Sequence, residues 1–140
     1  RLGKLAGKIG QRPLVILGGA LFAISALYRL MFLTAEVDYW IAIAIPLALD
    51  AVTISLIFPQ VTSVSVQALA ANRTGVGGGV TQAVRQFGGS FGVALTIALL
   101  GSASGTADLL AGFERIWWVL VAAGVITALL GLRLRNRAAA

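Results

Sequence analysis

The chain has 140 residues, 59% hydrophobic and 11% charged, with a net charge of +6 and neither cysteine nor histidine. A soluble domain carries about 25% charged residues, so this composition excludes a water-facing globular surface and predicts an all-α integral membrane protein. Without cysteine or histidine, disulfides, metal sites and thiol chemistry are excluded. The basic residues lie at the ends of apolar runs, where membrane proteins keep them, so we do not expect nucleic acid as a partner. We also expect no cofactor.

Four apolar segments are long enough to cross a hydrocarbon core about 30 Å thick, which requires about 20 helical residues. The first carries one charged residue, Arg29, and the second carries one, Asp50. Trp40 and the pair Trp117 and Trp118 lie where interface anchors are expected. The predicted spans cover about residues 13–33, 39–61, 75–101 and 116–132. The segment 62–74 is ambiguous, because it could extend the second helix. The stretch 102–115 separates the third and fourth spans, and its Ser/Gly-rich part GSASGTAD, residues 101–108, predicts a flexible loop.

Basic and acidic flanks alternate along the chain. The basic flanks hold Arg1, Lys4, Lys8 and Arg12, then Arg73, then Arg133, Arg135 and Arg137. The acidic flanks hold Glu36, Asp38, Asp108 and Glu114. Cytoplasmic flanks carry an excess of basic residues, and only an even number of spans gives this alternation. We therefore predict a multi-pass protein of the cell membrane, embedded in the lipid bilayer, with both termini in the cytoplasm.

The third span concentrates glycines and amides on one side. At 100° per residue, Gly75, Gly79, Gln82, Gln86 and Gly89 share a face, whereas Val80, Phe87 and Phe91 lie opposite. Small residues four apart allow helix backbones to approach closely, which predicts packing at Gly75, Gly79, Gly88, Gly89 and Gly92. Arg85 is expected near the cytoplasmic boundary, where it either snorkels or lines a cavity mouth, and Gln82 and Gln86 are further cavity-lining candidates.

Asp50 is expected near the middle of the bilayer, because it follows Trp40 by ten residues, or about 15 Å of helix. A carboxyl group facing a cavity there can hold a proton or a cationic substrate, each excluding the other. Thr53 and Gln60 share its stripe and are predicted to line the same cavity, whereas Ser55 lies opposite. The alternative is a structural Asp50 paired with a neighbouring helix, for which Arg85 is a candidate of doubtful depth. Because no catalytic triad, carboxylate pair or phosphate loop is present, we do not expect an enzyme.

Two stretches together resemble a known family. RLGKLAGKIGQRP is similar to the cytoplasmic signature loop of the major facilitator superfamily, through Gly3, Leu5, Lys8, Gly10 and Arg12, with Gly7 in place of the signature Asp. The stretch from Pro59 to Leu95 resembles the C-terminal part of its fourteen-helix drug:proton antiporter branch. There an R-x-G-x-x-x-G loop precedes an N/Q-x-x-R-Q-x-G-G-x-x-G helix, matched here by Arg73, Gly75, Gly79, Gln82, Arg85, Gln86, Gly88, Gly89 and Gly92.

This resemblance implies the C-terminal fragment of a proton-coupled secondary transporter of alternating-access type. Its implied substrate is a small hydrophobic or cationic compound exported against a proton gradient, and its implied partners are the N-terminal helices of the same transporter. Two alternatives remain open. One is a self-contained four-span exporter that forms homo-oligomers, and the other is a non-transporting membrane subunit that uses the glycine face for docking and Asp50 for assembly.

Overall fold

The computed structural model describes residues 10–32, 34, 38–67, 74–101 and 105–134. Within these ranges the chain is all-α. It contains α2 (Gln11–Met31), the single π-helical turn η1 (Tyr39–Ala44), α3 (Ile45–Gln67), α4 (Thr74–Leu100) and α5 (Thr106–Arg133). Four helices, with η1 and α3 counted as one, are long and apolar enough to cross a membrane. The predicted fold class is confirmed to this extent.

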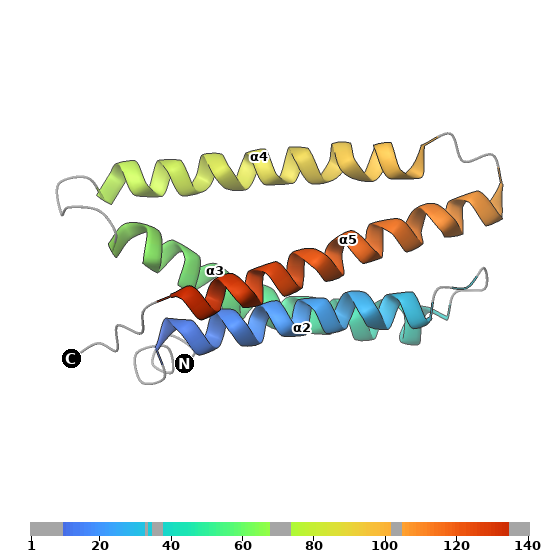
Figure 1. Cartoon of the computed structure of the whole chain (residues 1–140), viewed down its shortest axis with the longest axis horizontal. Coiled ribbons are helices and arrows are strands. Elements are labelled where there is room, and N and C mark those ends of the chain that lie inside the picture. Colours follow the sequence, from blue (N-terminus) through green and yellow to red (C-terminus); the bar gives the residue numbers. More distant parts are fainter. Residues whose placement is uncertain (1–9, 33, 35–37, 68–73, 102–104, 135–140) are drawn as a thin grey trace.

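The four long helices run alternately in opposite directions (Figure 1). The first turns of α2 and the last turns of α5 consequently lie at the same end, where a Cβ atom on Gly131 would be 2.9 Å from Ile16. This arrangement agrees with the predicted even number of spans.

The tightest packing joins α2 to α5 through small residues. A Cβ atom built on Gly19 would lie 2.5 Å from the backbone nitrogen of Ala128, and one on Gly124 would lie 2.7 Å from that of Ala23. The backbones therefore touch at Gly19 and Ala23 of α2 and at Gly124 and Ala128 of α5, two pairs spaced by four residues. Such spacing allows the close contact by which membrane helices associate.

The turn η1 joins directly to α3 and starts at a side-chain cap. The Asp38 carboxylate accepts hydrogen bonds from the backbone N–H groups of Trp40 and Ile41, at 2.9 and 3.2 Å. These bonds satisfy two of the donors that every helix start leaves unpaired. Beyond η1, α3 runs to Gln67, six residues past the predicted end of the second span. The ambiguous segment 62–74 is therefore helical in its first part.

The predicted loop 101–108 is wrong in its last three residues, because α5 begins at Thr106, ten residues before the predicted start of the fourth span. Gly105 has an extended backbone and caps the helix, and its carbonyl accepts a hydrogen bond from the N–H of Leu109 at 3.0 Å. Asp108 lies in the first turn, where a carboxylate interacts favourably with the helix dipole. The charged residues Asp108, Glu114 and Arg115 lie before the apolar run that predicts the fourth span, and they form helical turns that precede this run.

The helix α4 lies beside the other three and contacts α3 and α5 (Figure 1). Among the residues of α4 whose burial is described, Gly77 is the only buried one, whereas α2 buries residues along most of its length. The described core therefore consists of α2, α3 and α5, and α4 borders it.

Candidate functional site

An ion pair joins α2 to α3 within the segments that could cross a membrane. The Arg29 guanidinium donates from Nη2 to Oδ2 of Asp50 at 2.7 Å. Arg29 lies in the last turn of α2, and Asp50 follows the start of η1 by eleven residues. The two side chains are only 16% and 22% exposed, so most of each charge is removed from solvent.

Ser25 ties the two charged groups together. It lies one turn before Arg29 on α2 and is fully buried. Its hydroxyl accepts a hydrogen bond from Nη1 of Arg29 at 2.9 Å and donates to Oδ1 of Asp50 at 2.7 Å. The same oxygen lies 3.3 Å from the carbonyl oxygen of Pro46, which is also fully buried. Both carboxylate oxygens of Asp50 thus have a donor, as a buried charge requires.

The third helix at this site is α5. The Arg29 guanidinium lies over the ring of Trp117, with Cζ 5.0 Å from the ring centroid, a cation–π distance. One arginine therefore contacts a carboxylate, a hydroxyl and an aromatic ring on three helices.

The partner of Asp50 differs from the candidate considered in the sequence. The sequence offers Arg85 as the partner, although its position along α4 does not match the depth of Asp50. The structure pairs Asp50 with Arg29 instead. The signal that could have found the pair is the spacing of Ser25 and Arg29. These two polar residues lie four apart in an apolar helix and therefore on one face.

The predicted stripe on α3 is present. Thr53 and Gln60 are 2% and 6% exposed, Pro46 is buried with them, and Ser55 is exposed on the opposite side. The hydroxyl oxygen of Thr53 is buried and has no hydrogen-bond partner among the described residues. Thr53 and Gln60 are therefore placed inside the packed helices. Neither residue lines the groove between α3 and α4 that is described below.

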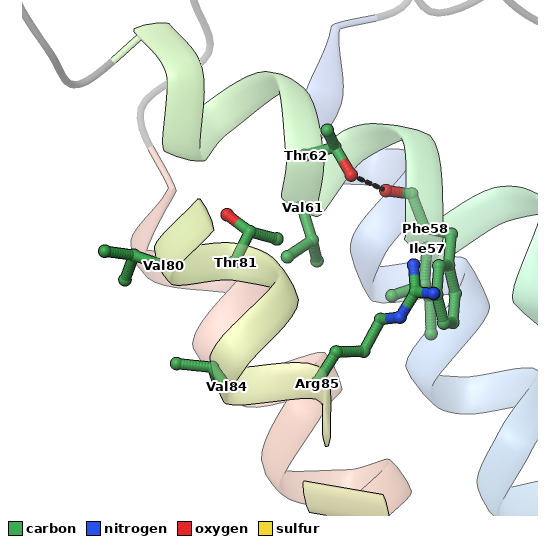
Figure 2. Close-up of a pocket in the computed structure, with 8 residues that line it drawn as sticks. All are labelled: Ile57, Phe58, Val61, Thr62, Val80, Thr81, Val84 and Arg85. Carbon is green, nitrogen blue, oxygen red and sulfur yellow. Dashed lines mark hydrogen bonds between the residues drawn. The ribbon is translucent and has the colours of Figure 1, made fainter. Parts of the chain in front are cut away.

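A groove runs between α3 and α4, and Arg85 forms part of its wall (Figure 2). Its volume is about 300 Å³. The Arg85 side chain extends across the groove toward Phe58, with Cζ 5.1 Å from the ring centroid. Apart from Arg85 and two threonines the walls are apolar. The lining residues are Ile57, Phe58, Val61, Thr62, Val80, Thr81, Val84 and Arg85. Gln82 and Gln86, which were predicted to line a cavity with Arg85, are exposed on α4 outside this groove.

The glycine face of α4 has no neighbour within the described residues. A Cβ atom added at Gly75, Gly79, Gly88, Gly89 or Gly92 would meet nothing within 4 Å. On the helical wheel, Gly77, Val80 and Val84 lie on the side opposite Gly75, Gly79 and Gly89, and that side faces α3. The described residues therefore supply no close contact for the glycine face, and its packing stays a prediction. The tight pair forms between α2 and α5, where Gly19 and Gly124 have the same four-residue spacing to a small residue.

The signature-like loop falls mainly outside the described residues, which exclude Gly3, Leu5 and Lys8. Gly10 precedes α2 with a φ of 86°, a left-handed conformation that glycine adopts without steric cost. Arg12 lies in the first turn of α2 and is half-buried. A turn at Gly10 followed by a helix is compatible with a loop that enters a membrane span.

Comparison with known proteins adds no relative: no family model, no curated protein and no solved structure matches the chain. The resemblance to the drug:proton antiporter branch therefore stays a prediction from the motifs.

Proposed function

We propose that the chain is the C-terminal four-helix part of a proton-coupled secondary transporter that exports small hydrophobic or cationic compounds by alternating access. The observation that supports this proposal most directly is the Arg29–Asp50 ion pair. Ionisable residues inside membrane helices are costly and usually mark an ion or substrate pathway. Here they are paired, hydrogen-bonded to Ser25 and shared by three helices.

The pair offers a physical basis for coupling. In the charged state, the carboxylate of Asp50 holds α3 against the end of α2. A proton on Asp50 removes that attraction and leaves Arg29 with Ser25 and Trp117, so the contact between α2 and α3 weakens. A proton can shift a transporter between two conformations only if it binds one conformation more tightly than the other. A helix contact that forms with charged Asp50 and weakens with protonated Asp50 would provide that difference. Rearrangement at this contact would then link proton uptake to the movement of the helices.

The rest of such a transporter would lie against α4. Gly75, Gly79, Gly89 and the amides of Gln82 and Gln86 lie on the side of α4 away from α3, although amides facing lipid are unfavourable. Additional helices, which the family resemblance places N-terminal to this chain, would cover this face. The membrane would then be the cell membrane, with both termini of the chain in the cytoplasm.

A second function, a non-transporting membrane subunit, is favoured by the same open face. In that case the glycines of α4 form a docking surface, and the Arg29–Asp50 pair fixes the position of α3 for assembly. A self-contained four-span exporter is the third candidate. It would bring two copies together through the same glycines.

Proton-driven efflux from proteoliposomes that contain the full-length gene product separates these functions. For the transporter, Asp50→Asn abolishes proton-driven efflux while the protein still purifies as an intact, folded species. Glu114→Gln, which removes an exposed carboxylate from α5, serves as the matched control and leaves efflux unchanged. Lost assembly with normal efflux in the assembled fraction would instead support the subunit, and a dimer of the 140-residue chain that transports alone would support the small exporter.

A further inference from the structure

Arg85 of α4 has no carboxylate partner among the described residues. Its guanidinium makes the contact with the Phe58 ring, and the five N–H donors have no acceptor there. Arg85 follows Thr74 by eleven residues and precedes Leu100 by fifteen, which places it about 16 Å and 22 Å from the two ends of α4. It is therefore nearer the middle of the helix than the boundary position that the sequence suggested.

A guanidinium inside a membrane helix faces an anion or a water-filled cavity, or snorkels to the interface. The Arg85 side chain extends into the groove toward Phe58. The chain has five acidic residues, and none of those described is available to Arg85. Asp50 is bound to Arg29, and Asp38 caps η1. Asp108 and Glu114 lie in the first turns of α5, which connects to the opposite end of α4. The counter-charge for Arg85 must therefore come from outside the described residues.

The groove beside Arg85 shows which kind of anion fits. Its volume of about 300 Å³ is at the lower end of the range for small-molecule sites, about 300–1,000 Å³. Phe58, Val61, Val80 and Val84 give it apolar and aromatic walls. The hydroxyls of Thr62 and Thr81 donate to carbonyl oxygens of their own helices, at 3.0 and 2.8 Å, so they are not available as donors to a ligand. Arg85 is therefore the principal hydrogen-bond donor in the groove.

We propose that the α3–α4 groove binds a small amphipathic organic monoanion of the carboxylate class. Its carboxylate pairs with the guanidinium of Arg85, which matches the planar, bidentate geometry of that group, and its apolar body lies against Phe58, Val61 and Val80. One cation in an apolar groove favours a single negative charge. Phospholipid head groups lie at the membrane surface, whereas Arg85 is about 16 Å from the nearer end of α4, which favours a free small molecule as the anion. This binding site depends on the groove alone and stands whether or not the chain transports anything.

Equilibrium binding to the chain in phosphatidylcholine nanodiscs tests the site, with empty nanodiscs subtracted. The probe is 2-naphthoate, and its neutral isostere 2-naphthamide is the control ligand. We expect one saturable naphthoate site per chain and binding of the amide weaker by about tenfold or more, because the charge-assisted hydrogen bonds are lost. Arg85→Gln should reduce naphthoate binding to the level of the amide. Arg133→Gln, which removes an exposed arginine at the end of α5, should leave it unchanged.

Two further variants keep the test decisive if Arg85→Gln does not fold. Arg85→Lys retains the charge and should retain part of the preference for naphthoate over naphthamide. Thr81→Cys introduces the only thiol in a chain without cysteine, and naphthoate should slow its alkylation while naphthamide does not. Equal binding of the two ligands, equal effects of Arg85→Gln and Arg133→Gln, or no protection of Thr81→Cys would overturn the proposal. Binding of an anionic phospholipid to Arg85 in place of naphthoate would also overturn it.

Discussion

Arg29 and Asp50 form the contact on which the proposed coupling depends, and each is stable only with the other. Removing one partner leaves a buried charge uncompensated, which costs about 3–5 kcal/mol. We expect Arg29→Gln and Asp50→Asn each to lower the free energy of unfolding in detergent by about 3 kcal/mol. The double variant should lose much less than the sum, because it leaves no unpaired charge. Additive losses, measured as a double-mutant cycle by thermal unfolding, would contradict a direct ion pair.

Two buried hydroxyls near this pair should respond in opposite ways. Ser25 exchanges hydrogen bonds with both charged groups, so Ser25→Ala is expected to destabilise the chain by about 1–3 kcal/mol. Thr53 has a buried hydroxyl without a partner among the described residues, so Thr53→Val should be neutral or stabilising by up to about 1 kcal/mol. Thermal unfolding of both variants tests this difference. A loss at Thr53 as large as that at Ser25 would show that Thr53 has a partner in the membrane.

The site could be predicted only in part from the sequence. Counting residues along an apolar run identified Asp50 as an intramembrane acid, and helical periodicity placed Thr53 and Gln60 on its buried side. Its partner Arg29 could not be assigned in the same way. Depth along each helix can be counted, but which faces of α2 and α3 meet depends on tertiary packing. A long arginine side chain also reaches beyond its own turn, so counting residues along the helices did not identify Arg29 as the partner, and the depth of Arg85 had already argued against that candidate.

At the scale of helices, the backbone contact between α2 and α5 is the most sensitive feature. A Cβ atom at Gly19 would lie 2.5 Å from a backbone nitrogen of α5 and would force the helices apart. We expect Gly19→Ala to lower the free energy of unfolding by about 2 kcal/mol, typical of overpacking. Gly89→Ala is the matched control in this chain, because its Cβ meets open space, and it should be neutral or slightly stabilising. Equal losses in thermal unfolding would contradict the observed packing.

Small-residue spacing predicts close helix packing without specifying the partner. Small residues four apart occur in α4, at Gly75 and Gly79, and also at Gly19 with Ala23 in α2. The spacing shows that a helix can approach another closely but does not specify which helix it meets. The sequence analysis therefore missed the α2–α5 contact, and the packing predicted for the glycines of α4 stays a prediction. If α4 docks helices outside this chain, Gly89→Leu should disrupt the full-length protein while leaving the 140-residue chain stable, a difference that size-exclusion chromatography would detect.

For the whole molecule, the four spans follow from apolar runs and flanking charges, which are properties of the sequence alone. Helix ends were less predictable. Charged residues such as Asp108 and Glu114 lie before the predicted start of the fourth span at residue 116, yet they belong to the first turns of α5. The alternating direction of the helices, with the start of α2 and the end of α5 together, agrees with the charge pattern and supports the proposed orientation in a membrane.

Single-cysteine labelling of whole cells tests this membrane arrangement most directly, since the chain contains no native cysteine. With a membrane-impermeant maleimide, Tyr39→Cys and Ala107→Cys should react in intact cells, because both positions are exposed at the end opposite the termini. Arg12→Cys and Arg133→Cys should react only after the membrane is permeabilised. Reaction of Arg12→Cys and Arg133→Cys from opposite sides, or of all four positions in intact cells, would contradict a chain that crosses the bilayer four times.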